Sequence, residues 1–270
     1  MKNTLSNFHT HTTFCDGKDT PETVVLAAID KGFTELGFSG HGYTPYDSRY
    51  CMKDTGSYIA EIKRLKREYR GKINIFLGTE EDAFSPVDRA RYDYVIGSCH
   101  YYRIGNEYLP IDSGIDYFNK CLDAFGHDLV RMAEVYYSEF TSYLKNRRPD
   151  IIGHFDLITK YDELAEPYFL GTPEYTKIAE KYTLVALGCG SIFEVNTGAI
   201  SRGYRSNPYP AENLLHILKK NDAKIILSAD SHRADTIDYY FNEARRYLYD
   251  IGFRTAYTLS DNGFLEYPLL

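Results

Sequence analysis

Two histidines near the start of the chain have the spacing of a shared ligand site. His9 and His11 lie one residue apart in the stretch FHTHTTFCDG, and Asp16 follows closely. Side chains two residues apart on a strand point to the same side, so this pair can present two imidazoles to one ion. The pair alone carries little weight, because a single histidine at a strand end is more often a hydrogen-bonded structural residue than a ligand.

Six later apolar segments of the chain also run into an imidazole or a carboxylate. The residues are His41 in LGFSGHG, Glu80 in IFLGTEED, His100 in YVIGSCH, His154 in IIGHFD, Glu194 in IFEVN, and Asp230 and His232 in IILSADSH. Carboxylates gathered in one place repel one another, and a bound cation removes that cost. Imidazole and carboxylate donors together favour Zn²⁺, Mn²⁺ or Fe²⁺ over Ca²⁺ or Mg²⁺.

The number of candidate ligands exceeds the need of one ion. The nine candidates are His9, His11, Asp16, His41, Glu80, His100, His154, Asp230 and His232. A catalytic ion uses about four protein ligands or fewer, so the set predicts two or three divalent ions with one bridging carboxylate.

The elements that must position these residues alternate between short strands and longer helices. Strands are predicted at 5–11, 35–40, 73–78, 94–98, 151–153, 192–195 and 224–229. Helices are predicted at 55–70, 115–146 with a break at Gly126, 173–187, 211–221, and 236–251 with Asp235 as its N-cap. We place His127 and His216 within helical patterns. Seven such repeats predict an α/β fold with a parallel, closed barrel, whose strands all end on one face.

Composition limits the class of protein. The 270 residues, 43% of them hydrophobic, can form one large core, and we expect a single barrel domain over 1–270. We expect no membrane span, no secretory signal and, from five scattered cysteines, a cytoplasmic location. The net charge of −7 argues against a nucleic-acid partner. The sequence leaves the oligomeric state open.

Seven motifs in order resemble those of a known family. HTHTTFCDG, GFSGHG, GTEED, IGSCHY, IGHFDLI, EVNTG and SADSH are similar to the successive motifs of the PHP family, named after polymerase and histidinol phosphatase. The resemblance implies a distorted (β/α)7 TIM-like barrel with a metal site at the C-terminal ends of its strands. It also implies a division of the ligands. One ion would take His9, His11, Glu80 and Asp230, a second would share Glu80 and add His100 and His154, and a third would take Asp16, His41 and His232.

The segment EVNTGAI…RGYR…PYP is similar to the branch of this family that hydrolyses L-histidinol phosphate in histidine biosynthesis. The implied activity is that of a phosphomonoesterase, with a water bridging two ions as the nucleophile. Catalytic roles are predicted for Glu80, Asp230 and His232, the last two as the nearest proton donors to the leaving alkoxide.

Two arginines past the sixth strand, Arg202 and Arg205, are the predicted phosphate-binding residues, although either could be a solvated surface residue. Glu194 and Asn196 could orient a ligating histidine or simply cap a loop. The candidates for binding the ammonium and imidazole groups of the substrate are Glu81, Asp82, Tyr101, Tyr102, Asp112 and Asp116. Alternatives are a phosphatase or phosphodiesterase acting on a nucleotide or phosphotyrosine, and a non-catalytic binding module, for which missing ligands would be expected.

Overall fold

Seven parallel strands form the centre of the molecule. The computed structural model describes residues 5–164 and 167–270. The strands of the main sheet are β1 (Ser6–Asn7), β2 (Glu35–Phe38), β3 (Asn74–Asp82), β4 (Tyr94–Ser98), β7 (Ile151–Ile152), β8 (Ile192–Asn196) and β9 (Ile225–Ser228). They are hydrogen-bonded in that order, so neighbours in the sheet follow one another along the chain. All seven strands were predicted near these positions.

The sheet curls until its first and last strands meet. Ser231 donates from its backbone nitrogen to the carbonyl of His9 at 3.1 Å, and its carbonyl accepts from His11 at 2.8 Å. The parallel bridge between Thr10 and Ser231 therefore closes the barrel just beyond β1 and β9. The first strand is shorter than predicted, because Asn7 Oδ1 takes the backbone N–H groups of His9 and Ala229, both at 3.1 Å, in place of ladder bonds.

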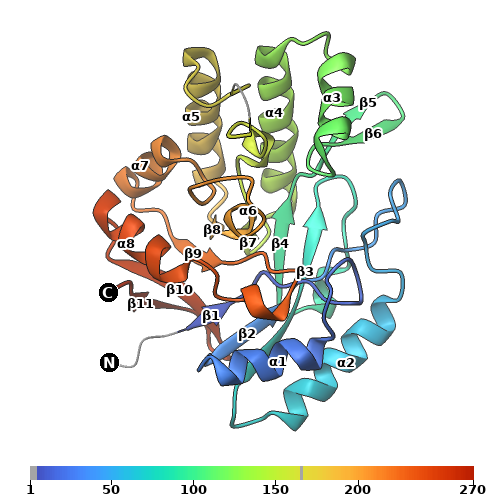
Figure 1. Cartoon of the computed structure of the whole chain (residues 1–270), viewed down its shortest axis with the longest axis vertical. Coiled ribbons are helices and arrows are strands. Elements are labelled where there is room, and N and C mark those ends of the chain that lie inside the picture. Colours follow the sequence, from blue (N-terminus) through green and yellow to red (C-terminus); the bar gives the residue numbers. More distant parts are fainter. Residues whose placement is uncertain (1–4, 165–166) are drawn as a thin grey trace.

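Helices cover the outside of the barrel (Figure 1). They are α1 (Pro21–Asp30), α2 (Thr55–Glu68), α3 (Ile115–Ala124), α4 (Leu129–Arg147), α5 (Pro173–Leu187), α6 (Gly198–Ser201), α7 (Glu212–Lys220) and α8 (Phe241–Ile251). Short 3₁₀ turns occupy Arg89–Arg91, Leu157–Thr159 and Ala234–Thr236. None of the described helices combines the length and apolar character that a membrane crossing requires.

The helix predictions are confirmed in outline and wrong in several details. Gly126 does separate α3 from α4, with a left-handed φ of 62°, and His127 follows it in the linker instead of in a helix. The last helix begins at Phe241 instead of 236, because Tyr240 has a left-handed φ of 64° that a continuous helix cannot contain. Asp235 therefore lies in a 3₁₀ turn and caps no helix. α1 was not predicted.

Two antiparallel hairpins were also missed: β5 (Tyr101–Ile104) with β6 (Glu107–Pro110), and β10 (Thr255–Ser260) with β11 (Gly263–Pro268). The second hairpin packs against the end of the barrel where the strands begin. Leu259 joins an apolar cluster there, and Thr258 donates to Ser6 Oγ at 3.0 Å.

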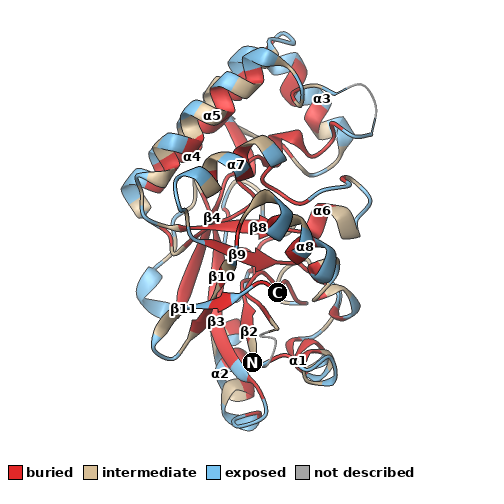
Figure 2. Ribbon diagram, turned by 90° about the vertical axis from the view of Figure 1, so that its left-hand side faces the viewer, coloured by how far each residue is buried: buried red, intermediate tan, exposed pale blue. Residues whose placement is uncertain are grey.

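Large apolar side chains fill the barrel at this end. The cluster consists of Phe8, Phe76, Tyr94, Ile96, Ile151, Ile192, Ile226 and Leu259. Glycines at 37 and 78 make room for the side chain of Tyr94, since a Cβ would lie 2.3 Å from its hydroxyl oxygen at position 37 and 2.3 Å from its ring at position 78. Buried residues run through the barrel strands as well as the helix faces that pack on them (Figure 2). The polar residues of the strands must therefore gather at the opposite end.

Candidate metal centre

Glu80 occupies the middle of a group of imidazoles at the C-terminal end of β3. Its side chain points into the barrel because it follows Phe76 and Gly78 at intervals of two residues, and it is 1% exposed. Five ring nitrogens surround its carboxylate: His41 Nδ1 at 2.9 Å, His154 Nε2 at 3.1 Å, His9 Nε2 at 3.2 Å, His100 Nε2 at 3.2 Å and His11 Nε2 at 3.6 Å. The structure thus brings imidazoles from the ends of four strands, β1, β2, β4 and β7, to one carboxylate on β3.

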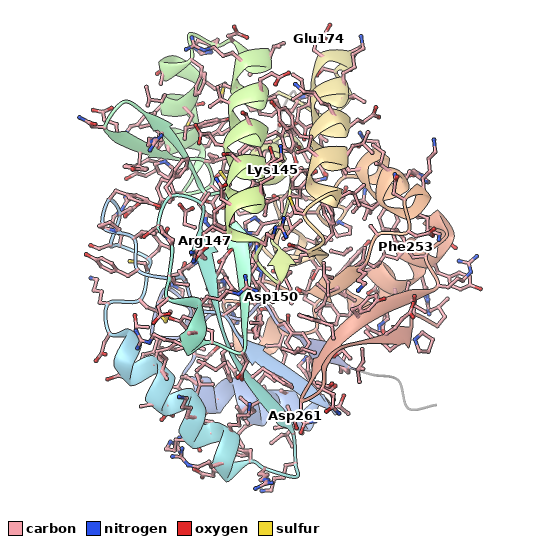
Figure 3. The ribbon with its side chains drawn as sticks, turned by 180° about the vertical axis from the view of Figure 1, so that it is seen from behind. Lys145, Arg147, Asp150, Glu174, Phe253 and Asp261 are labelled. Carbon is pink, nitrogen blue, oxygen red and sulfur yellow. The ribbon has the colours of Figure 1, made fainter. Side chains whose placement is uncertain are left out.

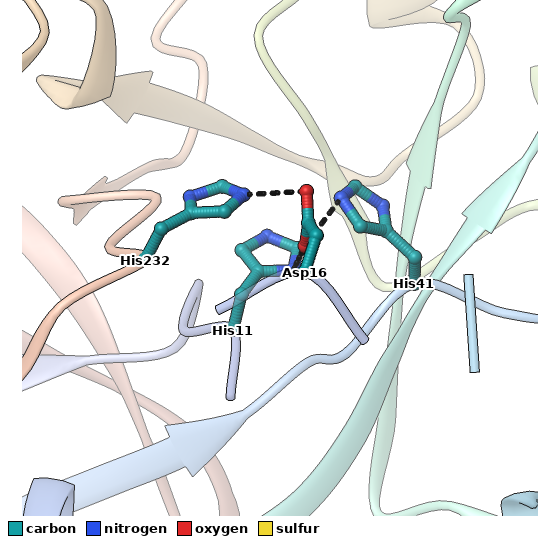
Figure 4. A group of neighbouring side chains, drawn as sticks. All are labelled: His11, Asp16, His41 and His232. Atoms are coloured by element: carbon teal, nitrogen blue, oxygen red, sulfur yellow. Dashed lines mark ion pairs between the residues drawn. The ribbon is translucent and has the colours of Figure 1, made fainter. Parts of the chain in front are cut away.

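Two further carboxylates extend the group. Asp230 Oδ1 lies 3.2 Å from His11 Nε2 and 3.6 Å from His9 Nε2. Asp16 Oδ2 lies 3.3 Å from His232 Nε2, and its Oδ1 lies 3.6 Å from His41 Nε2 (Figure 4). Since Nδ1 of His11 faces Asp16 at 3.9 Å, this ring stands between the two carboxylates.

The imidazoles and carboxylates gathered around Glu80 form a cage, and residues around this cage fix the orientation of its histidines. Glu194 Oε1 lies 2.6 Å from His9 Nδ1, and its Oε2 accepts the backbone N–H of His154 at 2.8 Å. Of the two roles considered for Glu194, the structure shows the orienting one. Asn196 supports it by donating to Glu194 Oε2 at 2.9 Å.

The three acidic residues that end β3 face different surroundings. Glu81 points away from the cage and binds Arg147 and the hydroxyl of Tyr143, at 2.7 and 2.8 Å. Asp82 Oδ2 lies 3.2 Å from His100 Nδ1, the ring nitrogen of His100 that does not face Glu80, and so fixes the orientation of that ring. Only Glu80 of the three faces the other imidazoles directly.

Burial and charge act against each other in the cage. Burial favours the neutral acid of Glu80, but the imidazoles of His9, His100 and His41 outweigh it and hold the pKa of Glu80 well below its usual range. Burial likewise opposes the charged form of His9, yet Glu194, Glu80 and Asp230 raise the pKa of His9 well above its usual value. Without another cation, protons on histidines must balance the carboxylates.

The pKa of His11 shifts in the opposite direction from that of His9. Burial, followed by repulsion from His41 and His232, lowers the pKa of His11 to about 3. The imidazole is therefore neutral at ordinary pH, which is the form that ligates metals.

The donor set fits divalent metal ions. Five buried atoms of the cage have no hydrogen-bond partner among the described residues: His9 Nε2, His11 Nε2, Asp16 Oδ1, Glu80 Oε2 and His154 Nδ1. Within four groups, the donor atoms lie within 4.8 Å of one another: His11, Asp16, His41 and His232; His9, His11 and Glu80; His9, His154 and Asp230; and His41, Glu80 and His100. Buried polar atoms are normally paired, so these unpaired nitrogens and oxygens are suited to binding a cation. All nine predicted ligands belong to these groups, and how they divide among ions stays a prediction.

A cavity of about 240 Å³ opens onto the cage. Arg202 lines it and donates to the Asp230 carbonyl and to Asp230 Oδ2, both at 2.9 Å. Lys160, Tyr50 and Tyr204 also line it and were missed. The only available signal for Lys160 was its place six residues after His154.

The structure does not bring Arg205 to this cavity. Its buried guanidinium donates to Thr159 Oγ1 at 2.6 Å and lies 4.6 Å from the ring centre of Tyr209. These contacts hold two loops together, and the place of Arg205 outside the described cavity wall does not support the prediction that it contacts a phosphate.

Of the residues left open for binding the rest of a substrate, Asp112 and Tyr101 line the cavity. Asp112 lies beside Lys160, whose Nζ donates to its carbonyl at 2.8 Å. Tyr102 is directed into the core, where its hydroxyl donates to the carbonyl of Met132. Asp116 lies in the first turn of α3 and is not part of the cavity wall.

Comparison with known proteins agrees with this architecture. The model of the PHP domain family matches residues 7–198, and the chain belongs to that family. A protein of Deinococcus radiodurans named "Probable histidinol-phosphatase" is 29% identical over 269 residues, which cover 93% of this chain and 95% of its own. The "Histidinol-phosphatase" of Bacillus subtilis is 26% identical and covers 86% of this chain and 95% of its own.

A solved structure shares the fold. Histidinol phosphate phosphatase from Lactococcus lactis, complexed with zinc, L-histidinol and phosphate, has a TM-score of 0.72 to this chain at 20% identity. The match covers 96% of this chain and 98% of that one. The prediction of a (β/α)7 barrel of the PHP type is thereby confirmed.

Proposed function

We propose that this protein is a metal-dependent phosphomonoesterase that hydrolyses L-histidinol phosphate to L-histidinol and phosphate. The observation that carries the proposal is the buried cage around Glu80, which opens onto a cavity lined by two cations, Arg202 and Lys160. The names of the similar proteins and the ligands of the Lactococcus lactis structure support this choice of substrate.

The cage would hold two or three ions of zinc, manganese or iron. His9, His11, Glu80 and Asp230 would bind one, Glu80 with His100 and His154 a second, and Asp16 with His41 and His232 a third. When bound, such ions supply positive charge for phosphate oxygens and lower the pKa of a coordinated water.

The residues of the cavity would bind and orient the substrate. Arg202 is fixed by Asp230, and its planar guanidinium suits phosphate oxygens. Lys160 adds a second positive charge at the cavity wall. Asp112 is the carboxylate of the described cavity wall that lies outside the predicted ligands, so it would receive the ammonium group of histidinol.

The leaving alkoxide needs a proton, and we propose that His232 and Asp230 relay it from water. Burial favours the neutral acid of Asp230, but Arg202 and His9 outweigh it and hold the pKa of Asp230 well below its usual range, so its carboxylate accepts a proton and passes it on. Oδ1 of Asp230 lies 3.7 Å from Nδ1 of His232. With 24% of its side chain exposed, His232 is the most open imidazole of the cage to the cavity and solvent. We assign proton delivery to this pair.

A substrate panel tests the proposal. L-Histidinol phosphate is compared with p-nitrophenyl phosphate, a phosphotyrosine peptide and a nucleoside monophosphate, using metal-loaded enzyme. We expect kcat/KM for L-histidinol phosphate to exceed the others by about 100-fold or more, because a polar site strongly rejects analogues that leave its groups unpaired. Equal or higher values for another substrate would contradict the assignment.

Chelation tests the metal requirement separately. Dialysis against a chelator should abolish the activity, and added Zn²⁺ or Mn²⁺ should restore it. Activity that survives complete removal of metal would exclude the proposed chemistry, and inactivity of the fully loaded protein on every phosphate would favour a binding module.

A further inference from the structure

A second hollow lies at the other end of the barrel from the metal centre. It has a volume of about 430 Å³ and is lined by Lys63, Lys66, Arg67, Arg70, Ile73, Asn74, Ile75 and Asp261. These residues belong to the end of α2, the beginning of β3 and the tip of the β10–β11 hairpin, where Asp261 is labelled in Figure 3. Six residues of β3 separate Asn74 from Glu80, or about 20 Å along an extended strand.

The hollow collects positive charge from one face of α2. Lys63, Lys66, Arg67 and Arg70 follow one another at intervals of three, one and three residues, which places them on one side of the helix and its continuation. Lys66 Nζ lies 3.2 Å from Asp93. Lys63, Arg67 and Arg70 are exposed, and their side chains make no hydrogen bond or ion pair with the described residues.

A neighbouring arginine on the same helix, Arg64, differs from the cations at the hollow in its ion pairs. Arg64 lies between Glu22 and Glu61, at 3.0 and 2.8 Å, and also pairs with Glu68. The helix thus surrounds Arg64 with carboxylates, while Lys63, Arg67 and Arg70 form no ion pair with a described residue, although Asp261 also lines the hollow. The whole chain has a net charge of −7, so this concentration runs against its overall sign.

Helix-end electrostatics explain only part of the pattern. Lys66 and Arg67 lie in the last turn of α2, where cations interact favourably with the helix dipole. Lys63 lies a turn earlier and Arg70 beyond the end, so the dipole does not account for four cations around one hollow.

We propose that this hollow binds a compact polyanion that carries two or more linked phosphate groups, as in inorganic polyphosphate or a nucleoside triphosphate. Two guanidinium groups and two ammonium groups can form several charge-assisted hydrogen bonds to such a chain. A nucleic acid would need a longer positive track, which the acidic remainder of the chain opposes.

Titration calorimetry on the full-length, metal-loaded protein tests this site, with MgATP and magnesium tripolyphosphate as probes. The variant Lys63→Gln/Arg67→Gln/Arg70→Gln should weaken binding at least about tenfold, since it removes three charge-assisted contacts. Its histidinol phosphate hydrolysis should match that of the wild type. Equal affinities for the two probes would identify the phosphate chain as the recognised group, and tighter MgATP binding would add the nucleoside.

Two controls separate this site from general electrostatics and from the metal centre. Lys177→Gln/Lys220→Gln/Arg246→Gln removes the same charge from exposed positions on other helices and should leave binding unchanged. Arg202→Gln, in the catalytic cavity, should also leave it unchanged. The proposal is overturned by any of four results: absence of binding at millimolar probe, equal weakening in the control triple variant, loss in Arg202→Gln, or tighter binding of a single-stranded oligonucleotide through the same three cations.

Discussion

The two ends of the barrel are built from the same strands and have opposite chemistry. Where the strands begin, the interior is filled by Phe76, Ile192 and Ile226, and the β10–β11 hairpin covers it. Where they end, the same inward-facing rows continue into Glu80, Glu194 and Asp230. In each of these strands, two or four residues separate an apolar wall from a buried acid.

One end of the barrel therefore contributes mainly to stability, and the other end contributes mainly to metal binding and activity. At the closed end, where the strands begin and the hairpin covers the barrel, apolar burial contributes to stability without any ligand. At the open end, where the strands finish, buried carboxylates and imidazoles need one another or a cation, which makes that end costly to fold and suited to metal binding. Changes at the open end should therefore alter activity and metal content, whereas changes at the closed end should alter stability.

The largest effect on activity is expected from Glu80→Gln. The substitution removes the charge that five imidazoles share, and it should lower kcat/KM by about 10³-fold or more. Metal analysis of the purified variant should show a loss of bound ions. A variant with normal metal content and activity would show that Glu80 is not the centre of the site. Glu81→Gln is the matched control, since Glu81 binds Arg147 outside the cage.

Asp16→Asn should have a more limited effect. Asp16 faces His41 and His232 on one side of the cage, so its loss should remove one ion and leave those bound near Glu80. Activity should fall by about 10²-fold, the scale of one lost electrostatic contact in a transition state. Metal stoichiometry decides the point, because simultaneous loss of all ions would contradict separate sites.

Arg202 and Arg205 should respond differently to the same change. Arg202→Gln should raise KM for L-histidinol phosphate about 10- to 100-fold, because a charged hydrogen-bond donor to the phosphate is lost. Arg205→Gln should mainly reduce stability, by about 3–5 kcal/mol, because it breaks a buried ion-pair network with Asp156. Steady-state kinetics and urea unfolding of both variants separate the two roles. A raised KM with normal stability in Arg205→Gln would instead indicate that Arg205 binds the phosphate of the substrate.

At the closed end, Leu259→Ala should reduce stability by about 2–5 kcal/mol through loss of packing in the barrel. Residual activity at low temperature should stay close to that of the wild type. On the same hairpin, Leu265 is 49% exposed, and Leu265→Ala should change stability by less than about 0.5 kcal/mol. Equal unfolding midpoints for the two variants would contradict the role given to the hairpin.

The smallest effect concerns pH in the metal-free protein. The pKa values of His9, His41 and His100 are raised in the fold by nearby carboxylates, despite burial. Their protons stabilise the fold below about pH 6.5, and this contribution is lost as the pH rises through the raised values. The Tm of chelated protein should therefore fall by at least about 3 °C from pH 6.5 to pH 9. The loaded protein should show a smaller fall, and a fall of the same size would exclude cations as substitutes for these protons.

The sequence predicted the open end better than the closed one. Strand ends followed by His or acidic residues indicate where side chains converge, because parallel strands in a barrel all end on one face. The prediction of Glu80 as a ligand, with Glu81 outside the metal set, agrees with the alternation of side chains along β3. The hairpin that covers the closed end has no such signal, since its pairing with the barrel depends on contacts between residues more than two hundred positions apart, as in Thr258 with Ser6.

Other errors have local causes. Arg202 and Arg205 look equivalent in SRGYRSNPYP, but only the fold shows that one faces Asp230 and the other Thr159. Lys160 lies beyond a 3₁₀ turn that no periodic pattern marks. The unity of residues 1–270 as one domain stays a prediction, as do the number and identity of the bound ions.

Anomalous X-ray diffraction from crystals of the metal-loaded protein is the most direct test of the central claim, that the polar end of this barrel is a metal centre organised by Glu80. Data collected on both sides of the zinc, manganese and iron absorption edges would place and identify each ion. We expect two or three peaks among the nine predicted ligands, with Glu80 bridging two of them. A fully active crystal form without a peak beside Glu80 would contradict the claim.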